Sequence, residues 1–209
     1  MYTPSHFRED RLPVLHEAIR QRGFATLITL GPRGIEATHL PLWLDSERGP
    51  FGTLYGHVAR ANPQWKDSLD GEREALAIFL GPDAYITPSW YASKRQHGEV
   101  VPTWNYVAVH ARGAVRFFDD PERLRKVVED LTEANEAGRA HPWAVSDAPE
   151  AYIRAHLAGI VGFELPIDRI EGSWKMSQNR PAEDRAGVAL GLEEGGAAAV
   201  AAAVKGRKP

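Results

Sequence analysis

The stretch that decides the fold is TWNYVAVHARGAVRFF, Thr103–Phe118, whose residues alternate in character. One face of the expected strand carries Thr103, Asn105, Val107, Val109 and Ala111, and it is apolar beyond Asn105. The other face is amphipathic: Trp104, Tyr106, Ala108, His110 and Arg112. Because successive side chains of a strand point to opposite faces, the pattern predicts a long strand with one face on a core. The amphipathic face is either a solvated barrel exterior or subunit contact, or the edge of a site where Trp104 and Asn105 meet a flat ligand.

Further β-rich runs lie before and after this strand, and turn signals separate them. They are ATLITL (25–30), IEATHLPLWL (35–44), GTLYGHV (52–58), EALAIFL (74–80), AYI (84–86), GIVGFEL (159–165) and RIEGSWKMSQ (169–178). Helical spacing and caps predict helices over 12–22, from Pro63 for one or two turns, over 121–137, from 149 to near 159, and from Pro181 onward. Strands in a run with helices toward the end indicate an α+β protein built on a small antiparallel barrel.

Composition excludes several classes of protein. The chain has 209 residues, 43% of them apolar and 25% charged, with a formal net charge of -3 and no cysteine. Disulfides, thiolate metal sites and cysteine nucleophiles are therefore excluded, and a reducing cytoplasm is the predicted location. The longest apolar run, AAAVAAAV (197–204), is too short to span a bilayer, so no membrane partner is expected. The sequence lacks an HExxH pair, a G-x-S-x-G elbow and a phosphate-binding glycine loop, so no metal site is expected and no catalytic residue is assigned.

Besides this strand, three segments are candidate sites, each with a structural alternative. In EATHLPLW, Pro41 indicates an edge strand or a bulge, and His39 is either structural or a ligand contact. In YGHVARANPQW, a helix start at Asn62 and the guanidinium of Arg60 suit a phosphate dianion, although a surface Arg is common. SWKMSQNR is a run of donors that is either a solvated loop or a polar surface directed at a ligand. The loop from Tyr91 to Val101 is expected to act as a lid or subunit contact.

The motifs YTPSHF, GHVARANPQW, ITPSWY, VPTWNYVAVH and SWKMSQNR, spread over residues 2–180, resemble the PaiB family of FMN-binding negative transcriptional regulators. The resemblance implies an antiparallel FMN-binding split β-barrel with peripheral helices, similar to pyridoxamine-phosphate oxidases, and a homodimer with FMN at the subunit interface. By motif position it implies that FMN contacts Thr38, His39, Leu40, Tyr55, His57 and Arg60. The site would be closed by Trp104, Asn105, Lys175, Ser177, Gln178 and Asn179.

The expected organisation is one domain over 1–187 and an Ala-rich helix with a basic tail, KGRKP, over 188–209. The resemblance implies a negative regulator that acts directly or indirectly, with FMN as ligand or sensor. A DNA contact is left open, but neither a helix-turn-helix nor a basic stripe is evident. The alternative is a flavin-dependent oxidoreductase acting on a small molecule, for which His39, His57 and Tyr106 are the available proton-transfer groups. A third alternative is a barrel that has lost its cofactor.

Overall fold

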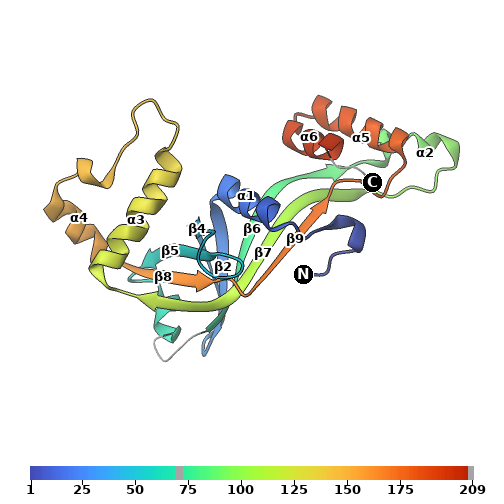
Figure 1. The fold of residues 1–209 in the computed structure, drawn as a ribbon. Coiled ribbons are helices and arrows are strands. Elements are labelled where there is room, and N and C mark those ends of the chain that lie inside the picture. The colour runs from blue at the N-terminus through green and yellow to red at the C-terminus, as the bar shows by residue number, and fades with distance from the viewer. Residues whose placement is uncertain (69–72, 207–209) are drawn as a thin grey trace. The chain divides into compact units, whose positions relative to one another are not determined.

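The protein is described by a computed structural model over residues 1–68 and 73–206, in which nine strands form one sheet (Figure 1). The strands are β1 (Arg8–Glu9), β2 (Phe24–Gly31), β3 (Gly34–Pro41), β4 (Trp43–Asp45), β5 (Thr53–Ala59), β6 (Arg73–Ile86), β7 (Thr103–Phe118), β8 (Ile160–Pro166) and β9 (Arg169–Lys175). The α-helices are α1 (Leu12–Arg22), α2 (Ser93–Gln96), α3 (Pro121–Glu136), α4 (Glu150–Leu157), α5 (Ala182–Glu194) and α6 (Ala198–Gly206). Short 3₁₀ helices are η1 (Ser5–Phe7), η2 (Pro63–Ser68), η3 (Pro88–Trp90) and η4 (Val145–Asp147). The predicted mixture of helices with an antiparallel sheet is confirmed.

Sheet topology explains the role of Pro41. The hydrogen-bonded strand order is β3-β2-β6-β7-β8-β5-β4, and β9 pairs with β1 and β7. Strands β3 and β4 follow each other in the chain but lie at opposite ends of this path, because β3 pairs with β2 and β4 pairs with β5. Proline cannot donate a ladder hydrogen bond, so it is tolerated at such an edge. The run IEATHLPLWL is thus two strands, and the edge-strand prediction is confirmed.

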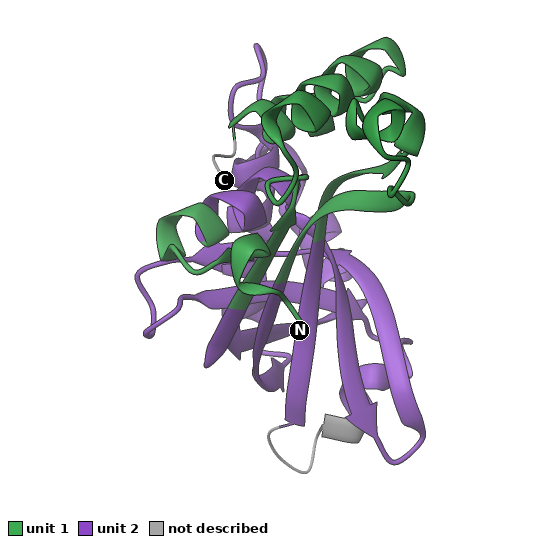
Figure 2. Ribbon diagram, turned by 90° about the vertical axis from the view of Figure 1, so that its right-hand side faces the viewer, with its two compact units in different colours: residues 1–15, 80–109, 171–209 green, residues 16–79, 110–170 purple. Residues whose placement is uncertain are grey.

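The chain divides into two compact units, which are coloured separately in Figure 2. Unit 1 contains residues 1–15, 80–109 and 171–209, and unit 2 contains residues 16–79 and 110–170. Strands β6 and β7 contribute residues to both units. The expected boundary between 187 and 188 falls inside α5, and the last three residues of the basic tail lie outside the described residues.

Unit 2 is organised by its strands and by α3. Asp120 caps α3 through a hydrogen bond from the Arg123 N–H, and Pro121 occupies the first turn. The apolar face of α3 packs with the region of η4 and α4, giving a buried cluster of Leu124, Val145, Ile153 and Leu157. The strands approach closely at Gly113, where a Cβ would lie 2.0 Å from the Pro166 carbonyl oxygen. The sequence therefore needs glycine at this strand position.

Unit 1 holds the segment after β6 against α5. A Cβ on Gly187 would lie 2.0 Å from the Trp90 carbonyl oxygen, and one on Gly191 would overlap the Trp90 ring. The next residue, Tyr91, is 1% exposed, and Ser93 donates both its N–H and its hydroxyl to the Asp184 carboxylate, at 2.9 and 2.7 Å. The start of the loop from Tyr91 to Val101 is therefore anchored to α5, and the role of this loop as a lid or subunit contact stays a prediction.

The long strands test the sequence pattern directly. In β7 the set Asn105, Val107, Val109 and Ala111 is buried, as the alternation predicts. The two runs EALAIFL and AYI were predicted as separate strands, but β6 is continuous through Gly81–Ala84. A Cβ on Gly81 would lie 2.8 Å from the Val107 side chain. This glycine therefore allows β6 to pack closely against Val107 of β7, and it does not mark a turn.

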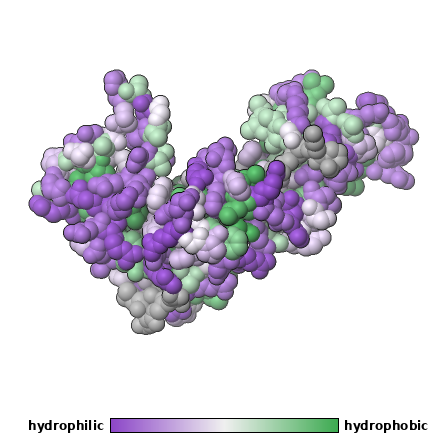
Figure 3. All heavy atoms as spheres, viewed as in Figure 1, coloured by the Kyte–Doolittle hydropathy of each residue, from purple (hydrophilic) through white to green (hydrophobic). Residues whose placement is uncertain are grey.

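Hydrophilic residues cover most of the face seen in Figure 3, in keeping with a charged content of 25%. In the described part of the chain, no helix combines the length and apolar character needed to cross a bilayer.

Candidate functional site

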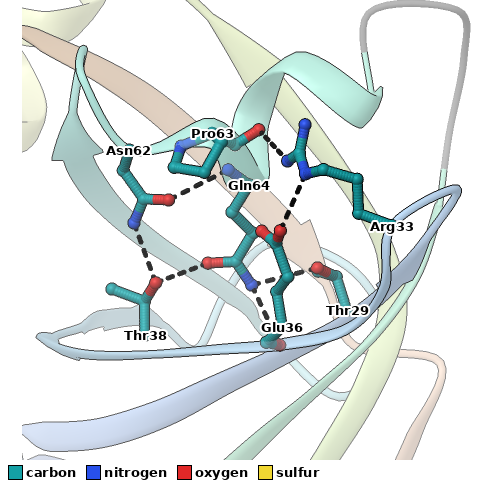
Figure 4. Close-up of polar contacts among 7 residues, drawn as sticks. All are labelled: Thr29, Arg33, Glu36, Thr38, Asn62, Pro63 and Gln64. Carbon is teal, nitrogen blue, oxygen red and sulfur yellow. Dashed lines mark hydrogen bonds and ion pairs between the residues drawn. The ribbon is translucent and has the colours of Figure 1, made fainter.

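A polar cluster of unit 2 centres on Gln64, the second residue of η2 (Figure 4). Its side chain is 1% exposed. The amide nitrogen donates to the Thr29 hydroxyl at 3.0 Å and to the Leu27 carbonyl at 3.3 Å, both on β2. The amide oxygen accepts from the Thr38 hydroxyl at 2.6 Å, on β3. Gln64 therefore fastens η2 to both strands.

Two predicted ligand groups are already used in this cluster. Thr38 also accepts a hydrogen bond from the Asn62 amide at 2.8 Å, so its hydroxyl both donates and accepts within the protein. Asn62 caps η2 as predicted, because its amide oxygen accepts from the Gln64 N–H at 2.9 Å. The backbone donor expected to meet a phosphate thus has an internal partner.

His39 and Leu40 follow Thr38 on β3 and lie on opposite faces of the strand. Leu40 is 4% exposed and contributes to the core, whereas His39 is exposed. The His39 Nδ1 atom is 2.9 Å from the hydroxyl of Thr26, its cross-strand neighbour on β2. This bond orients the imidazole and leaves Nε2 directed elsewhere, so His39 is the predicted β3 residue best placed to meet a ligand.

Tyr55 and His57 lie on the same face of β5. The Tyr55 hydroxyl accepts a hydrogen bond from Arg48, and its ring lies 5.6 Å from that of Trp43. Burial is the main cause that raises the pKa of Tyr55. Burial likewise lowers the pKa of His57, which favours its neutral imidazole.

The guanidinium of Arg60 is bound within unit 2. It donates to the Ala158 carbonyl at 2.8 Å and to the Ile160 carbonyl at 3.1 Å, and it lies 3.6 Å from the Asp119 carboxylate. These contacts fasten the end of β5 to the start of β8. A phosphate would have to share or replace them, so the role of Arg60 in cofactor binding stays a prediction.

In unit 1, adjacent predicted residues of β7 separate to opposite faces. The Trp104 ring is 54% exposed and meets Tyr85 of β6 edge-on, with the ring centres 6.0 Å apart. Asn105 is 0% exposed, and its amide exchanges hydrogen bonds with the Ser177 hydroxyl at 3.0 and 3.2 Å. Only Trp104 of this pair offers a surface for stacking.

The segment after β9 is a tight, internally bonded turn. Ser177 has a φ of 59°, a left-handed conformation that costs energy for a residue with a side chain. Gln178 closes the turn because its amide accepts from the Met176 N–H at 2.7 Å and donates to the Trp174 carbonyl at 2.6 Å. Asn179 is exposed. Most of the predicted donors of SWKMSQNR therefore serve the turn.

Lys175 is a cation of the same segment. Its ammonium donates to the Thr103 hydroxyl of β7 and is partly buried. Burial first, and then the positive charge of Arg180, lower the pKa of Lys175. A bound anion would offset both effects, so Lys175 is the residue of unit 1 best suited to an anionic group.

The predicted site residues thus form two separate sets. Thr38, His39, Leu40, Tyr55, His57 and Arg60 belong to unit 2, and Trp104, Asn105, Lys175, Ser177, Gln178 and Asn179 belong to unit 1. Sequence reasoning missed the buried Gln64, Glu164 and Asp184. The motif ANPQW contains Gln64, but nothing in it shows that the side chain turns inward.

In the part of the chain that the structure describes, no group of three or more His, Asp or Glu side chains could hold a metal ion.

The antiparallel sheet with peripheral helices is the fold of a split barrel. Residues 1–169 match the family described as "Putative FMN-binding domain", and the chain belongs to this family. The predictions of FMN as cofactor and of a PaiB-type protein are confirmed by this match and by a relative in Bacillus subtilis, "Protease synthase and sporulation protein PAI 2". That relative is 33% identical over 88% of this chain and 85% of its own length.

Other comparisons agree on the fold. An uncharacterized protein of Emericella nidulans is 35% identical over 92% of this chain and 90% of that protein. A conserved hypothetical protein of Mycobacterium tuberculosis has a TM-score of 0.59 at 12% identity, covering 87% of this chain and 94% of that one. The FAD and heme binding protein of Mycobacterium smegmatis has a TM-score of 0.59 at 13% identity, covering 80% and 73%. At these identities the structural likeness shows the fold alone.

Proposed function

We propose that the chain binds FMN as a homodimer and acts as a negative regulator of gene expression for which the flavin is a ligand or sensor. The observation that carries the proposal is the match of residues 1–169 to the FMN-binding family. The regulatory part is supported by the Bacillus subtilis relative, whose name refers to protease synthesis and sporulation. The absence of cysteine supports a reducing location, the cytoplasm.

Three of the candidate side chains have the chemistry that the parts of a flavin require. The imidazole of His39 is exposed and oriented, the Trp104 ring is exposed, and Lys175 is a partly desolvated cation. These groups suit a hydrogen-bonding ring edge, a flat ring face and a phosphate, respectively. We assign the β3 and β5 residues to one protomer and Trp104 with Lys175 to the other. When bound, FMN supplies the redox chemistry, and the chain supplies binding and orientation.

The decisive experiment is the absorption spectrum of the purified protein before and after addition of FMN. A flavin spectrum that stays with the protein on a sizing column, at the mass of two chains, is the expected result. Colourless protein that fails to take up FMN would contradict cofactor binding, and it would support a barrel that has lost its flavin. A monomer that binds FMN at full affinity would contradict the shared site.

Besides Lys175, Arg60 is the second candidate for the phosphate, and its substitution tests that role. Because charge-assisted hydrogen bonds to a phosphate are strong, Arg60→Ala should weaken FMN binding about tenfold. Arg139→Ala is the matched control, since Arg139 is a 64% exposed arginine paired with Glu136. Circular dichroism must first show that both variants fold, since Arg60 also bonds backbone carbonyls. An unchanged FMN titration for folded Arg60→Ala would remove this residue from the site.

The route of regulation is proposed to be indirect. A formal net charge of -3 disfavours a phosphate backbone, which proteins usually meet with clustered Lys and Arg. The holoprotein should therefore fail to shift labelled DNA at low salt. A tight, sequence-dependent shift would show direct binding instead.

The alternative, an FMN-dependent oxidoreductase, keeps the same cofactor. The exposed, oriented imidazole of His39 favours it, because such a group can donate or accept a proton beside a reacting molecule. Rapid bleaching of the bound flavin by NADH or NADPH would support the enzyme. Inertness toward both nucleotides would support the sensor.

A further inference from the structure

A separate cavity of unit 2 lies between β4, β5 and α3, and its lining pairs aromatic rings with cations. Its volume is about 370 Å³, at the lower end of the range for small-molecule sites. In Figure 1, α3 lies alongside β5 and β8. The cavity is lined by three rings and three cations: Trp43, Tyr55, Phe118, Arg48, Arg123 and Lys126.

Each cation is held over one of the rings. The Arg123 guanidinium lies 3.8 Å from the centre of the Phe118 ring, and Arg48 lies 5.7 Å from that of Tyr55. The Lys126 ammonium lies 5.9 Å from the centre of the Trp43 ring. Such contacts limit the freedom of long side chains, so the positive groups are positioned before a ligand arrives.

One buried carboxylate beside this cavity is shared by several guanidiniums. Glu164, only 5% exposed, contacts Arg48 at 3.2 Å, Arg123 at 3.2 Å and Arg116 at 3.8 Å. Lys126 pairs with Asp130, and Asp45, the remaining acid of the lining, accepts from the Glu47 N–H. A guanidinium carries five N–H donors, so the two oxygens of Glu164 cannot fill those of Arg48 and Arg123, and both keep donors for an anionic group.

Tyr55 adds a neutral donor to this positive setting. Its hydroxyl accepts a hydrogen bond from Arg48 and keeps its own proton, because burial raises the pKa of the phenol. Tyr55 can therefore donate to an anionic oxygen while Arg48 stabilises the same group.

We propose that this cavity binds a small aromatic carboxylate, or a flat anion of the same chemistry, at a site separate from the flavin. The rings contact the flat body, and the guanidiniums with the Tyr55 hydroxyl hold the acid group. Tyr55, assigned to FMN by motif position, then belongs to this second site. The inference does not rest on the proposed regulatory function.

The test uses the fluorescent probe anilinonaphthalene sulfonate, a flat anion, with the FMN-loaded protein. Naphthoate should displace the probe, whereas naphthamide, which has the same rings without the charge, should displace it much less. Equal displacement by both compounds would mean that the cations have no role and would overturn the proposal. Binding of the probe to flavin-free protein but not to the FMN-loaded protein would show that the cavity is the flavin site; that too would overturn a separate site while leaving FMN binding intact.

Variants on α3 locate the site. Arg123→Gln should weaken naphthoate binding about tenfold, and Arg123→Lys should restore part of it. Lys126→Gln, at a 69% exposed residue, should fold like the parent protein and weaken binding about two- to fivefold. The matched control is Arg125→Gln on the same helix, whose side chain pairs with Glu150 outside the cavity. If Arg123→Gln and Lys126→Gln both bind naphthoate as the Arg125→Gln control does, the proposal is wrong.

Discussion

Gln64 in unit 2 and Asp184 in unit 1 are both buried side chains that fasten a short helical segment to regular structure. Each is 1% exposed. Gln64 uses a neutral amide to join η2 to β2 and β3, whereas Asp184 uses a carboxylate to join α5 to Ser93 at the start of α2. The neutral network is independent of pH, but the charged one is stable only while the carboxylate is ionised. The two units should therefore respond differently to acid.

The largest effect is expected from Gln64→Leu. The substitution leaves the Thr29 and Thr38 hydroxyls without this partner and removes the link between η2 and both strands. We expect a loss of about 2–4 kcal/mol in the free energy of unfolding, measured with urea at neutral pH. The matched control is Gln21→Leu, because Gln21 is exposed and donates to Glu17 on the surface of α1; its change should stay within about 0.5 kcal/mol. Similar losses for both variants would show that the buried network adds no stability.

Asp184→Asn should have a smaller effect that depends on pH. Burial alone would raise the pKa of Asp184, but hydrogen bonds from Ser93 and the charge of Arg180 together lower it. A lowered pKa in the folded state means that the stability is present above the unfolded pKa, about 4, and is lost as pH falls through the folded pKa. The variant should lose about 1–3 kcal/mol at neutral pH.

The difference between parent protein and Asp184→Asn should therefore shrink as the pH of the urea titration is lowered below about 4. Gln64→Leu supplies the control, since its cost should not follow the titration of a carboxylate. A gap between parent and Asp184→Asn that stays constant with pH would contradict the assigned charge state of Asp184.

Local sequence patterns predicted part of this structure and missed the buried polar contacts. Alternation along β7 and the caps Asp120 and Asn62 are local signals, and the predicted strand and helices were found there. The partners of Gln64 and Asp184 lie far along the chain, so local patterns could not identify them. The runs EALAIFL and AYI were predicted as separate strands because the constraint on Gly81 between them, the Val107 side chain, comes from another strand.

For the candidate site, residue type predicted which groups can bind a flavin but not which were already in use. The hydroxyls of Thr38 and Ser177 and the guanidinium of Arg60 are suitable donors, yet each has internal partners. The three-dimensional packing determines whether such a group bonds within the protein or stays available to a ligand. His39, Trp104 and Lys175 therefore emerge as stronger candidates than the motifs alone indicated.

The smallest effect concerns Ser177, where unit 1 combines a buried hydroxyl with a φ of 59°. Both Ser177→Ala and Ser177→Gly remove the hydrogen bonds to Asn105, but glycine adopts this φ without the strain that a Cβ causes. Against this, glycine has more freedom in the unfolded chain. We expect the glycine variant to be more stable than the alanine variant by about 0.5–1 kcal/mol in urea unfolding, because the left-handed strain exceeds that entropy. An alanine variant as stable as the glycine variant, or more stable, would contradict this expectation. The left-handed backbone at Ser177 would then add no strain of its own, and it would only reflect the hydroxyl contact with Asn105.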